Sequence, residues 1–127
     1  MSVKFKVIEK GQPGVVGGGI KKFYASTSLS GEMTLDKLTK QIERVSTVNG
    51  ADIRAVLYAM VEIMQDALED GQAVRIGELG SLRVSISSNG ELSEEEVTAN
   101  SIKGAKTIFT PGKSLKKMLN NLSYEKV

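Results

Sequence analysis

Two stretches of the chain decide its fold: Gly71-Gln72-Ala73-Val74-Arg75-Ile76-Gly77-Glu78-Leu79-Gly80-Ser81-Leu82-Arg83-Val84 and, about thirty residues later, Phe109-Thr110-Pro111-Gly112-Lys113-Ser114-Leu115. The first stretch predicts a strand, a bend that its glycines permit, and a second strand. The second stretch predicts a third strand that leads into a helix, with Thr110 as the cap and Pro111 at the first helical position. The two stretches therefore predict a small sheet whose last strand runs directly into a helix.

Two amphipathic helices precede this sheet. Thr34 is the predicted N-cap of a helix that ends near Ser46, and Asn49 is the predicted N-cap of a second helix that Gly71 ends. The apolar positions of the second helix follow helical spacing and are Ile53, Val56, Leu57, Met60, Val61, Met64 and Leu68. So wide an apolar stripe exceeds what one small sheet covers, which favours a homodimer interface. A core within one monomer is the alternative.

The predicted strands have one apolar and one polar face. Leu82, Val84 and Ile86 alternate with Arg83, Ser85 and Ser87, so the apolar face is expected to pack on helices. If Phe109 points inward, Lys106 lies beside Arg83 on the open face, although a slip of one residue would reverse this. In the last helix the predicted buried stripe consists of Leu115, Met118, Leu119 and Leu122.

The first thirty residues predict a β-hairpin. Residues 3–7 alternate apolar and basic side chains, and residues 22–25 suit a returning strand. The glycine-rich residues 11–19 between them predict a mobile loop. The sequence thus predicts an extension over residues 1–30 and a main domain over residues 31–127.

The composition of the chain excludes several classes of function. The chain has no histidine and no cysteine, so His-dependent catalysis, typical zinc sites and disulfides are excluded, and we expect no enzyme, metal or cofactor. Gly112-Lys113-Ser114 is not a phosphate-binding loop, because Thr107 stands where that motif needs glycine. No apolar run is long enough for a membrane span, and no secretory signal is expected. The net charge is +2, but residues 1–30 carry +4 and residues 102–127 carry +5, which suits a localised phosphate-facing patch.

These pieces, in this order, resemble the HU and integration host factor family of bacterial histone-like DNA-binding proteins. The matching pieces are Val74-Arg75-Ile76, Gly80-Ser81-Leu82 and Pro111-Gly112-Lys113, and the resemblance covers residues 34 to about 122. The amino-terminal hairpin resembles the extended HU-related type. The resemblance implies an α+β, HU-like dimer fold with two N-terminal helices, a three-stranded antiparallel sheet with a β-arm, and a C-terminal helix. It also implies non-sequence-specific binding of double-stranded DNA in the bacterial nucleoid, in the cytoplasm, with a role in chromosome condensation.

The DNA-binding residues that follow from this hypothesis are basic side chains of the sheet and the last helix. They are Arg83, Lys103, Lys106, Lys113, Lys116 and Lys117, and the N-terminal strands offer Lys4, Lys6, Lys21 and Lys22 in addition. The free N–H groups at the start of the last helix, with Lys113 beside them, suit a DNA phosphate. No small-molecule substrate is expected.

The chain departs from the family's pattern in the turn between the first two strands of the sheet and in the β-arm. Glu78 stands where the family has a turn glycine, and Leu79 where it has an aromatic residue. Residues 88–101 contain four glutamates and no proline, lysine or arginine, and Ser93 to Glu96 has capping-box spacing. Intercalative DNA bending is therefore expected to be reduced or absent. The alternative function is an HU-fold protein–protein interaction module that has lost DNA binding and uses the hairpin as an exposed edge.

Overall fold

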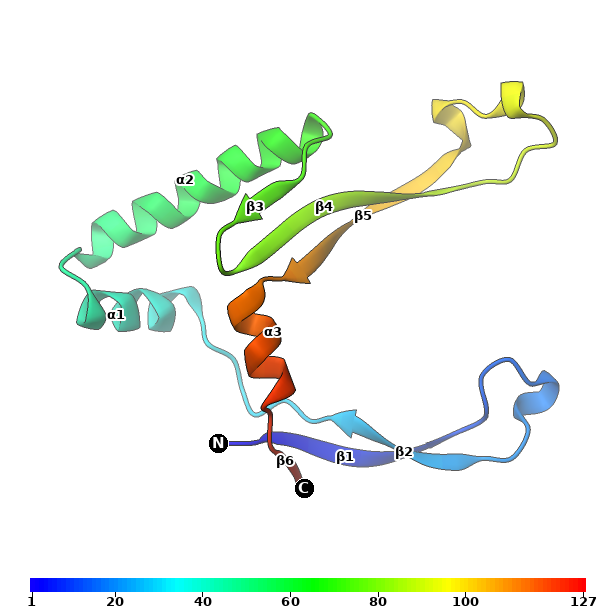
Figure 1. The fold of residues 1–127 in the computed structure, drawn as a ribbon, viewed down its shortest axis with the longest axis horizontal. Coiled ribbons are helices and arrows are strands. Elements are labelled where there is room, and N and C mark those ends of the chain that lie inside the picture. Colours follow the sequence, from blue (N-terminus) through cyan, green and yellow to red (C-terminus); the bar gives the residue numbers. More distant parts are fainter. The chain divides into compact units, whose positions relative to one another are not determined.

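A computed structural model describes residues 1–127 and shows a mixed α+β protein (Figure 1). In chain order its elements are β1 (Val3–Lys10), β2 (Lys22–Thr27), α1 (Leu35–Val45), α2 (Gly50–Glu69), β3 (Val74–Ile76), β4 (Gly80–Ser88), β5 (Ile102–Pro111), α3 (Lys113–Asn120) and β6 (Tyr124–Lys126). Short 3-10 turns lie at Val16–Gly18, Glu94–Glu96 and Ala99–Ser101. None of the helices is both long enough and apolar enough to cross a membrane.

The chain divides into two compact units. The terminal unit consists of Met1–Leu38 and Leu119–Val127, and the central unit consists of Thr39–Met118. Each unit contains one three-stranded sheet. Sheet A, in the terminal unit, has the strand order β2-β1-β6, and sheet B, in the central unit, has the order β3-β4-β5.

Sheet A confirms the predicted hairpin and adds a strand that the sequence did not predict. β1 and β2 pair antiparallel from Phe5–Thr27 to Lys10–Lys22. β6 pairs with β1 in parallel, with Val3 opposite Tyr124. At this edge Glu125 accepts hydrogen bonds from the Lys4 ammonium at 2.8 Å and the Ser2 hydroxyl at 3.0 Å. These two bonds, the Lys4 bond first, hold the pKa of the Glu125 carboxyl below its ordinary value.

The predicted caps of the first two helices are confirmed. The Thr34 hydroxyl accepts from the Lys37 N–H at 3.3 Å, and the Asn49 side chain accepts from the Asp52 N–H at 3.0 Å. Each bond satisfies one of the backbone donors that a first helical turn leaves free. Gly71, with a φ of 80°, follows the end of α2 and donates to the Leu68 carbonyl at 3.0 Å. This left-handed conformation favours glycine, which explains why α2 stops there.

The two fold-deciding stretches meet in sheet B. Gly80 pairs with Pro111, and the Gly112 N–H donates to the Leu79 carbonyl at 2.9 Å. Thr110 and Pro111 are therefore the last two residues of β5, and the prediction that they cap and open the helix is wrong. Proline fits here because β5 is an edge strand, where a missing N–H costs no ladder hydrogen bond. The helix begins at Lys113 and ends at Asn120, so Leu122 lies beyond it and not in its stripe.

The apolar side chains expected to form the core are mostly exposed within one chain. Ile53 is the single buried hydrophobic residue. On α2 the exposed fractions of Val56 and Ile63 are 65% and 69%, and on sheet B those of Val84 and Phe109 are 40% and 44%. Within one chain, α2 lies against only part of the apolar face of sheet B, where Leu68 lines a pocket with Val84. The rest of the apolar side chains are left uncovered in the single chain.

Candidate nucleic-acid interface

The polar face of sheet B gathers basic side chains in the predicted register. Arg83 pairs with Ile108 and Ser85 pairs with Lys106 across β4 and β5. Directly paired residues of antiparallel strands share a face, so Arg83 and Lys106 are diagonal neighbours on the same side of the sheet. Both side chains are exposed. The register with Phe109 on the opposite, apolar face is thereby confirmed, since Phe109 pairs with Leu82.

Arg75 belongs to this face and was not among the predicted site residues. It pairs with Ser81 across β3 and β4, which places it diagonally next to Arg83. Its side chain is exposed. The signal was present in the sequence, because Arg75 is the polar residue between Val74 and Ile76 in a strand with period two. We call Arg75, Arg83 and Lys106, with their hydroxyl neighbours, the sheet B face; these neighbours are Ser81, Ser85, Ser87 and Thr110.

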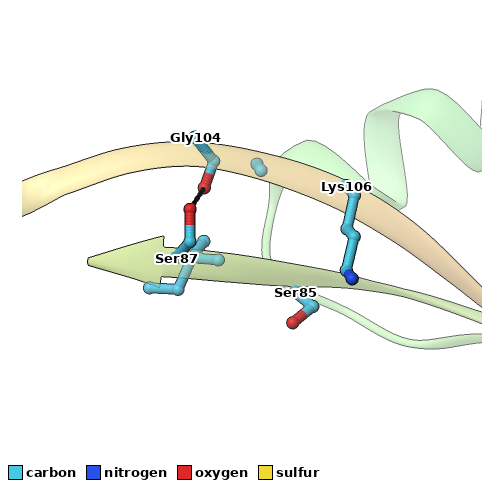
Figure 2. Close-up of a pocket in the computed structure, with 6 residues that line it drawn as sticks. Ser85, Ser87, Gly104 and Lys106 are labelled. Atoms are coloured by element: carbon cyan, nitrogen blue, oxygen red, sulfur yellow. Dashed lines mark hydrogen bonds between the residues drawn. The ribbon is translucent and has the colours of Figure 1, made fainter. Parts of the chain in front are cut away.

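A shallow hollow of about 380 Å³ lies where this face continues along the arm. Figure 2 shows Lys106 extending from β5 toward Ser85 of β4, and Ser87 beside Gly104. The Ser87 hydroxyl donates to the Gly104 carbonyl at 3.5 Å. An ammonium group and two hydroxyls at one point of a strand pair are donors of the kind that contact phosphate oxygens.

Lys103 does not join this row in register. The pairing of β4 with β5 shifts between Ser87 and Ser88, from Gly104 to Ile102, and leaves Lys103 as the extra residue of a bulge. A bulged residue has no directly opposite partner, and its side chain is re-aimed relative to the strand alternation. Lys103 is exposed but lies at the border of the sheet B face.

The three predicted lysines of α3 share one side of the helix. Lys113, Lys116 and Lys117 are spaced i, i+3 and i+4, and all three are exposed. Their helix follows β5 directly, because only Gly112 separates Pro111 from Lys113.

The start of α3 already holds a carboxylate. The Ser114 hydroxyl donates to Glu78 at 3.2 Å, and Glu78 belongs to the turn over residues 77–79 whose Leu79 carbonyl accepts from the Gly112 N–H. A phosphate at this helix start, as the sequence suggested, would compete with Glu78 for the positive end of the helix.

The tip of the arm is acidic and internally bonded. Its 3-10 turn at Glu94–Glu96 is confirmed, but the Ser93 side chain makes no capping bond there. The capping box lies one turn later, between Thr98 and Ser101. Ser101 is buried and its hydroxyl donates to Glu91 at 3.0 Å. The tip therefore presents carboxylates on a small ordered turn, and the adjacent strands carry the basic groups.

Comparisons with known proteins agree with this architecture. The family model described as "HU domain fused to wHTH, Ig, or Glycine-rich motif", named HU-HIG, matches residues 1–126. Among solved structures, the crystal structure of a "putative bacterial DNA binding protein" from Bacteroides vulgatus is similar, with a TM-score of 0.68 and 12% sequence identity. That match covers 99% of this chain and 48% of the Bacteroides vulgatus chain, so this chain spans about half of its length. No curated protein matches the sequence.

Proposed function

Because the chain belongs to the HU-HIG family of HU domains fused to other domains, we propose that it binds double-stranded DNA without sequence specificity. The observation that carries this proposal is the sheet B face, where Arg75, Arg83 and Lys106 lie together with hydroxyl groups and without an acidic side chain. Guanidinium, ammonium and hydroxyl groups are the main donors to DNA phosphates. The description of the Bacteroides vulgatus protein as DNA-binding supports the same proposal. At 12% sequence identity, the similarity of the two structures shows a shared fold.

The proposed contacts are to the phosphate backbone rather than to base edges. They are made by Arg83, Lys103, Lys106, Lys113, Lys116 and Lys117, with Arg75 added. We assign no base contact to the helices, since α1, α2 and α3 each carry an apolar side that suits packing. Backbone contacts of this kind hold DNA of any sequence and weaken steeply with salt. The proposed role is that of a nucleoid architectural protein in the bacterial cytoplasm that contributes to chromosome condensation.

We propose that the active form is a homodimer with the HU-like arrangement. A second copy would cover the exposed apolar side chains of α2 and sheet B, among them Val56, Ile63, Val84 and Phe109. Residues 31–127 would form the HU-like domain, and residues 1–30 its hairpin extension. The chain's last strand, β6, joins the sheet of that extension.

The test is fluorescence polarisation with a nonspecific duplex across a salt series. Replacing Arg83 and Lys106 by glutamate should weaken binding at least tenfold at about 100 mM salt. It should lower the slope of log K against log salt by about 2 for each chain that contacts the duplex, because each lost phosphate contact removes about 0.9. A matched control replaces Lys37 and Lys40 of α1 by glutamate, which changes the net charge equally outside the proposed face. An equal effect of both double substitutions would contradict the assignment of the site.

The second candidate is an HU-fold interaction module that no longer binds DNA. The observation that favours it is the acidic arm tip, with Glu91 and Glu94–Glu96, because a DNA-facing arm of this charge would be repelled by phosphates. Absence of any binding at about 20 mM salt, where phosphate contacts are strongest, would select this candidate.

A further inference from the structure

Sheet A has two chemically different faces. Across β1 and β2 the pairs Phe5–Thr27, Val7–Ala25 and Glu9–Phe23 lie on one face. The pairs Lys6–Ser26, Ile8–Tyr24 and Lys10–Lys22 lie on the other. The first face is mostly apolar and the second is basic. We call the second face, which also includes Lys4 and Glu125 at its β6 edge, the sheet A basic face.

The charges on the sheet A basic face are not balanced within the chain. Its one carboxylate, Glu125, is bonded to Lys4 at 2.8 Å, at the end of the sheet where β6 pairs. Lys6, Lys10 and Lys22 have no ion-pair partner, and the Lys10 ammonium lies 5.0 Å from the centre of the Tyr24 ring. All three lysines are exposed. Three uncompensated positive charges therefore remain on one side of a small sheet.

The position of two of these lysines opposes the stability of the hairpin. Lys10 and Lys22 are directly opposite each other in register, where like charges destabilise an antiparallel pair. An anion lying across the two strands would remove this repulsion. Lys6 and Lys10 are four residues apart on β1, and at about 3.3 Å per residue the uncompensated row extends over about 13 Å. That length fits a linear polyanion better than a single phosphate group.

We propose that Lys6, Lys10 and Lys22 form a second contact surface for the phosphate backbone of duplex DNA, separate from the sheet B face. This inference rests on the proposed DNA binding and extends it to the terminal unit. Duplex DNA fits better than a lipid surface because the most exposed apolar groups of sheet A, Phe23 and Tyr124, belong to the opposite face. The apolar pair on the basic face, Ile8 and Tyr24, is half-buried. A membrane-binding surface needs apolar side chains beside its cationic ones.

The test uses the full chain and a nonspecific duplex in a salt series. Replacing Lys6, Lys10 and Lys22 by glutamine should lower the slope of log K against log salt by about 2 to 3 for each chain that contacts the duplex, and it should weaken binding at least tenfold at about 100 mM salt. The matched control replaces Lys37, Lys40 and Lys126 by glutamine; it removes the same charge, and its one position in sheet A, Lys126, pairs with Phe5 on the opposite face. The control should shift affinity less than about threefold, as a change in net charge alone does in screened solution.

Additional variants and measurements distinguish a wrong second surface from a wrong proposed function. Replacing the same three residues by arginine keeps the charge and should restore the wild-type slope, while circular dichroism shows that each variant is folded. If the glutamine variant keeps the wild-type slope while the Arg83 and Lys106 variant loses affinity, the second surface is wrong and the proposed function stands. If the wild-type chain does not bind duplex DNA, both fail. Binding of phosphatidylserine vesicles that depends on these lysines, with unchanged DNA affinity, would also overturn the inference.

Discussion

Gly80 is one of two glycines, with Gly112, at which an added Cβ would collide with backbone where β4 joins β5. It is buried with a φ of 142°, and a Cβ there would meet the Thr110 carbonyl and come within 2.9 Å of the Phe109 ring. The Thr110 contact is with backbone, which cannot turn aside as a side chain can. Gly80→Ala should therefore lower the free energy of unfolding by about 2 to 4 kcal/mol in urea denaturation, the range for strain combined with overpacking.

Gly90 provides the control for this prediction. It lies in the arm, where an added Cβ would have no atom within 4 Å, and its φ is not left-handed. Gly90→Ala should change the free energy of unfolding by less than about 1 kcal/mol. A similar loss for both substitutions would mean that glycine flexibility, and not the close approach at Gly80, matters.

Residues whose role depends on near neighbours in sequence were predictable. Thr34 and Asn49 were recognised as caps because a cap bonds to an N–H three residues ahead. The position of Pro111 could not be predicted, because proline suits both the first turn of a helix and the end of an edge strand. Only its pairing with Gly80, thirty-one positions away, separates the two roles. Arg75 was overlooked, although the strand alternation that assigned Arg83 applies to it equally.

At the scale of elements, β6 is the part that sequence reasoning missed. Tyr124–Lys126 is too short to show a period, and it is a strand only because β1 offers a free edge. We expect removal of residues 122–127 to leave a two-stranded hairpin, which is marginally stable in water. Amide hydrogen exchange in β1 and β2 should then lose most of its protection.

The Glu125→Gln variant tests the contribution of the Lys4–Glu125 ion pair separately from that of strand β6. It keeps β6 but removes the bond to Lys4, which is exposed and worth little. Protection of β1 and β2 should persist in this variant at pH 7. Because the pKa of Glu125 is lowered in the folded chain, its contribution is present above its unfolded pKa and is lost as pH falls through the folded value. Unchanged protection after truncation would show that the hairpin is stable without β6.

The β-arm is the element where family pattern and chain chemistry disagree. Its strands were predicted from alternation and confirmed, but its tip carries Glu91 and Glu94–Glu96 and no proline to insert between bases. Energy transfer between dyes at the two ends of a 30-base-pair duplex should therefore stay unchanged at saturating protein. Replacing the four glutamates by glutamine should raise affinity by reducing repulsion, still without bending. A large rise in transfer with the wild-type chain would contradict this account of the arm.

At the scale of the whole molecule, each of the two units leaves large apolar side chains exposed. In the terminal unit the exposed fractions of Phe23 and Leu29 are 71% and 87%, and in the central unit those of Val56 and Ile63 are 65% and 69%. A single buried hydrophobic residue is too little apolar burial to offset the conformational entropy of folding. The wide apolar stripe of α2 already predicts from the sequence that this helix packs against more than one small sheet. Which part of the molecule, or which second copy, packs on it cannot be predicted from the pattern of a single segment.

Homodimer formation is the proposal that accounts for this surface, and light scattering tests it. The wild-type chain should have a mass near twice 13.7 kDa, and its melting temperature should rise with protein concentration, as for a dimer whose subunits fold together. Val56→Glu with Ile63→Glu places charges on the uncovered side of α2 and should abolish the dimer and cooperative unfolding. Glu62→Gln with Glu69→Gln changes the polar side of the same helix and should leave both unchanged. A wild-type mass near 13.7 kDa at about 50 μM, with a cooperative and concentration-independent transition, would show instead that the single chain covers α2 itself.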